Sequence, residues 1–182
     1  FVELYSLTLE RPDALQLYQA VSTKFPAISF NIYSSERWYV EQEDEWVKQE
    51  AAITKMDPES ISMEYFLKEH LPVHKILCMG NPDDIQKLED ELAGANLSNI
   101  SYYRSKDTYM EIVNNQVSKL GALDFLCEKY GVELENTLAI GDNFNDMPMI
   151  IHAGKGIAMG NAPDEVKQAA DCVTDTNDEN GF

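Results

Sequence analysis

The spacing of hydrophobic and polar residues changes character near residue 115. Before that point, helical and strand-like patterns follow one another irregularly along the chain. We predict helices over 13–25, 43–54, 60–70 and 83–93, and strands over 27–33, 37–41, 75–79, 100–103 and 109–113. A short polar segment joins the first two strands, as in a hairpin. This pattern predicts an α+β region whose sheet is largely antiparallel.

After residue 115 the alternation becomes regular. Predicted helices over 118–130, 146–153 and 164–170 alternate with short apolar strands over 137–141, 156–159 and 172–174. Gly131 follows the first of these helices, where a left-handed cap is expected, and Pro148 lies in the first turn of the second. Such alternation with short loops is typical of half of a parallel α/β sheet covered by helices. We therefore predict two domains, 1–115 and 116–182.

The net charge of the chain argues against two classes of binding partner. The 182 residues include 14 Lys and Arg against 32 Asp and Glu, which gives a net charge of −18. Nucleic acids and anionic membranes bind clustered basic residues, so neither is expected as a partner. Any phosphate must then be bound by local positive charge. No apolar stretch is long enough to span a bilayer and no signal peptide is visible, which predicts a cytoplasmic protein.

The three cysteines carry no recognisable function. Cys78, Cys127 and Cys172 form no CxxC motif, and each lies in an apolar run. We expect reduced, buried thiols, as in most free cysteines of cytoplasmic proteins.

The densest group of polar residues runs from Gly141 to Asp146, directly after a predicted strand. Ligands of open parallel sheets bind beyond the carboxyl ends of the strands, where Asp142 would suit Mg²⁺. Asn145 and Asp146 lie at the mouth of the next helix, where backbone N–H groups favour anions. Either residue alone could equally be a simple helix N-cap. The whole run indicates a functional site.

Lys119 is the second candidate. Ser118 is a plausible N-cap, which places Lys119 in the first turn of a helix, at the positive end of its dipole. The cost at an exposed site is only about a few tenths of a kcal/mol, so a solvated surface lysine is one interpretation. The other is a cation placed where a phosphate binds.

Four segments together resemble the haloacid dehalogenase-like (HAD) superfamily and, within it, the Cof-type phosphatases. They are QVSKLGAL at 116–123, LAIGDNFNDMPM at 138–149, GIAMGNA at 156–162 and ADCVTDTNDENGF at 170–182. The resemblance implies an α/β fold. Residues 116–182 would form the C-terminal half of a Rossmann-like catalytic core, and residues 1–115 would form the large α/β cap that selects the substrate.

The resemblance also implies a role for each site residue. Lys119 matches the lysine that binds the transferring phosphoryl group, and Asn145 matches an asparagine at the phosphate. Asp142 matches the aspartate that ligates Mg²⁺. Asp146 matches the second acid of that motif, a catalytic residue that supports the metal site. The implied function is a Mg²⁺-dependent phosphatase of small phosphorylated metabolites such as sugar phosphates, acting through an aspartyl-phosphate.

One part of the family pattern has no match. The nucleophilic Asp of the family precedes the cap, and here the predicted cap begins almost at Phe1. We therefore expect these 182 residues to be inactive without an N-terminal core segment, on the same or a separate chain. Two alternatives stay open. One is a non-catalytic remnant or split-gene partner module. The other is a different HAD phosphotransfer enzyme, such as the phosphorylation domain of an ion pump.

Overall fold

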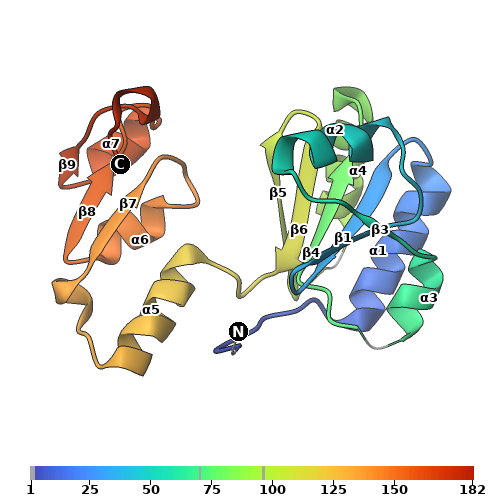
Figure 1. Ribbon diagram of the computed structural model, residues 1–182, viewed down its shortest axis with the longest axis horizontal. Helices are drawn as coiled ribbons and strands as arrows, with labels where there is room; N and C mark the ends of the chain where they lie inside the picture. The colour runs from blue at the N-terminus through green and yellow to red at the C-terminus, as the bar shows by residue number, and fades with distance from the viewer. Residues whose placement is uncertain (1–2, 70, 96) are drawn as a thin grey trace. The chain divides into compact units, whose positions relative to one another are not determined.

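The structure is a computed structural model that describes residues 3–69, 71–95 and 97–182. The chain divides into two compact units, Phe1–Gln116 and Val117–Phe182 (Figure 1). The boundary predicted from the sequence lies one residue earlier. Among the described residues, no helix has the length and apolar character that crossing a membrane requires.

The first unit is built around one mixed sheet. Its elements follow the chain as α1 (Arg11–Lys24), β1 (Ser29–Ser34), β2 (Arg37–Val40), α2 (Glu45–Thr54), β3 (Glu59–Ser60), α3 (Met63–Lys68), β4 (Lys75–Met79), α4 (Pro82–Gly94), β5 (Ile100–Lys106) and β6 (Tyr109–Asn114). The strand order is β3-β2-β1-β4-β6-β5. Every neighbouring pair is antiparallel except β2 with β3, which confirms the largely antiparallel sheet.

Strand register explains the core of this unit. Ile32 lies opposite Ile76, and Ile76 lies opposite Ile112, so three fully buried side chains form a row across the sheet. Helices α1, α3 and α4 add their apolar faces to the same cluster. On the other face, Val47 of α2 packs in a second cluster that includes Trp38. Each such side chain contributes about 1.5–3 kcal/mol through its burial.

Two predicted elements of this unit need correction. The predicted helix 60–70 begins only at Met63, because Ser62 caps it and the residues before it extend the sheet as β3. His70, at its predicted end, lies outside the described residues. Strand β5 continues three residues beyond the predicted 103, because a bulge between Arg104 and Lys106 lets it keep pairing with β6.

The second unit has the alternation that the sequence predicts. Its elements are α5 (Lys119–Tyr130), a 3₁₀ turn (Leu134–Asn136), β7 (Leu138–Gly141), α6 (Met147–His152), β8 (Lys155–Ala158), α7 (Asp164–Ala169), β9 (Cys172–Val173) and a second 3₁₀ turn (Asn177–Glu179). The three strands are parallel, in the order β7-β8-β9. Gly131 ends α5 with a φ of 64°, which confirms the left-handed cap. Together with the first unit, this confirms the predicted α/β fold class.

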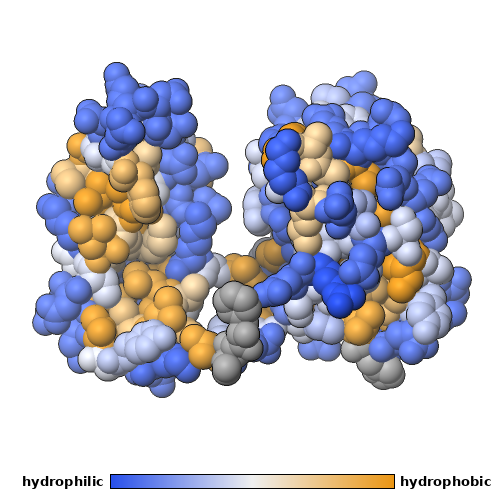
Figure 2. All heavy atoms as spheres, in the orientation of Figure 1, coloured by the Kyte–Doolittle hydropathy of each residue, from blue (hydrophilic) through white to orange (hydrophobic). Residues whose placement is uncertain are grey.

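The core of the second unit is small. Its cluster of buried hydrophobic residues consists of Ile150 on α6, Ala158 on β8, Ala162 in the loop before α7 and Val166 on α7. The opposite side of the sheet carries Leu138, which is 61% exposed. Figure 2 shows hydrophobic residues on the surface of this unit.

Two of the three cysteines are buried and the third is exposed. Cys78 and Cys127 are buried, as predicted, and burial raises the pKa of the Cys78 thiol to about 12. Cys172 is exposed, so the prediction of a buried thiol is wrong there. The reason is that β9 is a two-residue strand at the edge of the sheet, where both of its residues are exposed.

Candidate active site at the carboxyl end of β7

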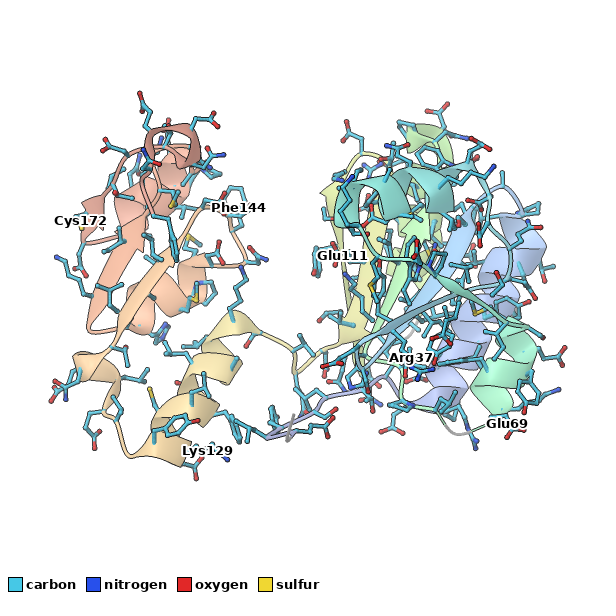
Figure 3. The ribbon with its side chains drawn as sticks, in the orientation of Figure 1. Arg37, Glu69, Glu111, Lys129, Phe144 and Cys172 are labelled. Atoms are coloured by element: carbon cyan, nitrogen blue, oxygen red, sulfur yellow. The ribbon has the colours of Figure 1, made fainter. Side chains whose placement is uncertain are left out.

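The candidate site begins where β7 ends. Residues 142–146 form the loop between β7 and α6, and Phe144 projects from this loop (Figure 3). Gly141, the last residue of the strand, lies directly against Asp146. A Cβ atom at position 141 would lie 2.4 Å from the Cβ of Asp146, a distance that real Cβ atoms do not adopt. Glycine at position 141 therefore allows the loop to fold back over the strand end.

Asp146 is the buried centre of the loop, with 2% of its side chain exposed. Its Oδ2 atom accepts hydrogen bonds from the backbone N–H groups of Asp142 and Asn143, both at 3.0 Å. Its Oδ1 atom accepts a hydrogen bond from the ammonium group of Lys119. Although Asp146 immediately precedes α6, its side chain caps no helix N–H group. Asp146 is therefore the N-cap residue of α6 by position only, because its carboxylate bonds to the loop instead of the helix.

These contacts hold the Asp146 carboxyl in its charged form. Burial by itself disfavours the charge. The hydrogen bond from Lys119 and those from the two backbone amides outweigh burial, so the pKa of Asp146 lies below its ordinary value. The site therefore keeps a fixed negative charge beside a fixed positive one.

Lys119 is the first residue of α5, and Ser118 caps that helix by accepting a hydrogen bond from the N–H group of Gly121 at 2.9 Å. The Lys119 side chain is 50% exposed. Its ammonium group contacts a carboxylate from a different element, which offsets the unfavourable end of the helix dipole. The structure thus brings together two predicted site residues that lie 27 positions apart in the sequence.

Asp142 and Asn145 remain open to solvent. Asp142 is exposed, and its Oδ2 atom accepts a hydrogen bond from the side-chain amide of Asn161 at 3.0 Å. Its Oδ1 atom accepts no hydrogen bond within the described part of the chain. Asn145 is exposed in the turn before α6, and the described residues make no hydrogen bond with its side chain. Both side chains can therefore bind a ligand without first losing a protein partner.

Most of these residues line one hollow of about 260 Å³. It is lined by Lys119, Ile140, Gly141, Asp142, Asp146, Met159 and Phe182. Asn145 is not part of this lining. Within the described residues, no group of three or more His, Cys, Asp or Glu side chains could hold a metal ion. Mg²⁺ is usually bound by only one or two carboxylates with water and phosphate oxygens, so Asp142 on this hollow fits such an ion.

Asn161 was not predicted as a site residue. Its only sequence signal was its position in the segment GIAMGNA, at the end of a neighbouring parallel strand. Carboxyl ends of parallel strands lie at the same edge of a sheet, and this geometry could have indicated Asn161.

Comparisons of the sequence with known proteins point to the same protein family. The family model for haloacid dehalogenase-like hydrolases matches residues 3–182. A Haemophilus influenzae relative is 34% identical over 180 residues, which cover 98% of this chain and 66% of the relative. The 5-amino-6-(5-phospho-D-ribitylamino)uracil phosphatase YcsE of Bacillus subtilis is 48% identical over 77 residues, which cover 42% of this chain and 31% of that protein.

Solved structures agree. A haloacid dehalogenase-like hydrolase from Bacteroides thetaiotaomicron superposes with a TM-score of 0.88 at 35% identity, over 98% of this chain and 66% of that one. A Thermotoga maritima structure superposes with a TM-score of 0.85 at 28% identity, over 96% of this chain and 64% of that one. The chain thus spans about two thirds or less of the length of these relatives.

Proposed function

Because the chain belongs to the haloacid dehalogenase-like hydrolase family, we propose that the protein is a Mg²⁺-dependent phosphatase of small phosphorylated metabolites. The observation that carries this proposal is the hollow beyond β7, which is lined by both Lys119 and the exposed Asp142. A phosphate monoester with a bound divalent cation needs one group of each sign. Similarity to a Bacillus subtilis phosphatase of a ribityl phosphate supports sugar-like phosphates as substrates.

Each residue of the site takes one task in this proposal. Asp142 holds the Mg²⁺ ion, which neutralises phosphate charge when bound. Lys119 binds a phosphoryl oxygen through its half-exposed ammonium group. Asn145 donates a hydrogen bond to the same phosphoryl group. Asp146 fixes the direction of Lys119 and the shape of the loop, because both of its oxygens are already engaged inside the protein.

Local charge is essential to this site. The chain carries a net charge of −18, which repels an anionic substrate at long range. The ammonium group of Lys119 and a metal ion at Asp142 act within a few ångströms, a distance at which salt screens them little. Positive charge confined to one hollow also favours small monoesters over polyanions.

We propose that the first unit acts as the cap that selects the substrate, and that the nucleophilic Asp comes from a segment outside residues 1–182. The 182 residues alone are then expected to be inactive. Hydrolysis of p-nitrophenyl phosphate with Mg²⁺ and with EDTA tests this, in the 182-residue chain and in a chain extended to the length of the relatives.

Variants of the extended chain test the assigned residues. Removal of one group that stabilises phosphoryl charge should lower kcat by about 10²- to 10³-fold in Lys119→Ala and in Asp142→Ala. Lys129→Ala, in the last turn of the same helix, is the matched control and should retain full activity. An extended chain with no Mg²⁺-dependent hydrolysis would favour the non-catalytic module. Unchanged activity in Lys119→Ala would overturn the site assignment.

A further inference from the structure

Asn161 connects three segments of the second unit. It lies in the loop between β8 and α7, and its Nδ2 atom donates to Oδ2 of Asp142 at 3.0 Å. Its Oδ1 atom accepts from the backbone N–H of Asn177 at 3.1 Å. One side chain therefore ties the loop after β7 to the turn near the end of the chain.

The backbone around Asn161 is held independently of its side chain. The N–H of Met159 donates to the carbonyl of Gly141 at 2.9 Å, and the N–H of Gly160 donates to the carbonyl of Asp175 at 3.0 Å. The Thr174 hydroxyl donates to the carbonyl of Gly181 at 2.8 Å, which closes the terminal turn. Removal of the Asn161 side chain should therefore leave these segments in place.

The chemistry of the two partners fixes the orientation of the Asn161 amide. A carboxylate only accepts hydrogen bonds, and a backbone N–H only donates. Rotation of the amide by 180° would place its oxygen against the Asp142 carboxylate and its NH₂ group against the N–H of Asn177. Both contacts would be repulsive, so the NH₂ group is directed at Asp142 in one way only.

We propose that Asn161 is a positioning residue that holds the Asp142 carboxylate in one orientation for binding a divalent cation. The proposal rests on the proposed role of Asp142. An exposed carboxylate without a partner samples several rotamers and loses that freedom when it binds a metal. Asn161 occupies Oδ2 and leaves Oδ1 for the cation. Residues that support a metal ligand in this way typically contribute about 10- to 100-fold in metal affinity.

Two substitutions at Asn177 give a matched pair for testing the bridge. Asn177→Pro removes the N–H group that orients Asn161, whereas Asn177→Ala keeps it. Proline fits this position because Thr176 has a φ of −72° and a ψ of 163°, the extended conformation that a residue before proline adopts. Its fixed φ also suits the first residue of a helical turn.

The first measurement is Mn²⁺ binding to the 182-residue chain by isothermal titration calorimetry. We expect Asn161→Ala to weaken Mn²⁺ binding by about 10- to 100-fold. Asn177→Pro should weaken it less, and Asn177→Ala should not change it. Circular dichroism and thermal unfolding of each variant verify that the fold is retained. Equal Mn²⁺ affinity in the wild type and Asn161→Ala would overturn the proposal.

The second measurement does not depend on a metal. Crystal structures of the wild type and Asn161→Ala should show one Asp142 rotamer in the former and more than one in the latter. A single unchanged rotamer in both would contradict a positioning role. If the wild type and Asp142→Ala both fail to bind Mn²⁺, the metal assignment of the proposed function fails, while the rotamer comparison still decides the role of Asn161.

Discussion

The two units differ greatly in the number of hydrophobic side chains that they bury. The first surrounds a six-stranded sheet with two clusters of buried hydrophobic residues. The second has a buried hydrophobic cluster of four residues on one side of a three-stranded sheet, and apolar side chains such as Leu138 are exposed. Extensive burial lets the first unit stabilise itself through packing. In the second unit, the hydrogen bonds and the ion pair of the loop between β7 and α6 contribute more to the local stability.

Among the residues that the structure describes, each unit has one buried carboxylate, and the two carboxylates differ in their partners. Glu50, on α2, is 8% exposed and accepts a hydrogen bond from the Tyr109 hydroxyl at 2.7 Å. It forms no ion pair among the described residues. Asp146 pairs with a half-exposed ammonium group beside a hollow. The Glu50 carboxylate thus makes a polar contact inside a packed core, whereas the Asp146 carboxylate lies beside a hollow that a ligand can enter.

The largest expected effect is on packing in the first unit. Phe66→Ala removes a fully buried side chain from the main cluster and should lower the free energy of unfolding by about 3–5 kcal/mol. Tyr65→Ala, on the same helix at a position that is 56% exposed, is the control and should change it by less than about 0.5 kcal/mol. Urea unfolding measures both. Similar losses in the two variants would show that burial does not dominate here.

The next effect distinguishes the two carboxylates. Asp146→Asn turns an NH₂ group toward the Lys119 ammonium group or toward the loop amides, and should destabilise the second unit by about 1–3 kcal/mol. Glu50→Gln can still accept from the Tyr109 hydroxyl and should cost less than about 1 kcal/mol. Denaturant unfolding followed by NMR signals of each unit measures both. A larger loss in Glu50→Gln would reverse the comparison.

Acid should destabilise the second unit by protonating the Asp146 carboxylate. The pKa of Asp146 lies below its ordinary value in the folded protein, against the opposing effect of burial, because Lys119 and two backbone amides hold the charge. Its contribution to stability is therefore present above about pH 3.9 and is lost as the pH falls through the folded value. Thermal unfolding between pH 6 and pH 2 should show this loss. It should be absent in Asp146→Asn.

Alkali should affect the first unit first. Burial, with the nearby carboxylates of Glu50 and Glu111, raises the pKa of Tyr33 to about 12. Burial and the hydrogen bond to Glu50 also raise the pKa of Tyr109. The stability from these neutral hydroxyls is present below about pH 10 and is lost as the pH rises through the folded values. Tyr109→Phe should flatten the alkaline decline in thermal unfolding temperature. An unchanged decline would exclude Tyr109 as a cause.

Local patterns predicted most of the fold. Periodicity found the helices and strands, and cap residues such as Ser118 and Gly131 located helix ends. The errors fall where tertiary contacts decide. Residues 59–60 join a sheet edge because β2 is nearby, and Cys172 is exposed because β9 is a short edge strand.

The sequence offered four candidate site residues, but neither Asn161 nor the arrangement of these side chains. The order strand, Gly, Asp and helix indicated where Asp142 lies, since that geometry is local. The contact between Lys119 and Asp146 spans 27 residues and depends on how α5 packs near the loop. The bridge from Asn161 to Asp142 and Asn177 joins three segments, so no local pattern contains it.

The smallest expected effect compares equivalent helix caps in the two units. Asn81 caps α4 by accepting from the N–H of Asp84 at 3.0 Å, and Ser118 caps α5 by accepting from the N–H of Gly121 at 2.9 Å. Each change to Ala should cost about 1 kcal/mol of stability in urea unfolding. Lys119 follows Ser118 directly, so fraying of this turn should also raise KM of the extended chain, whereas Asn81→Ala should leave KM unchanged. Equal KM values in both variants would show that Lys119 is positioned by Asp146 alone, without help from its helix.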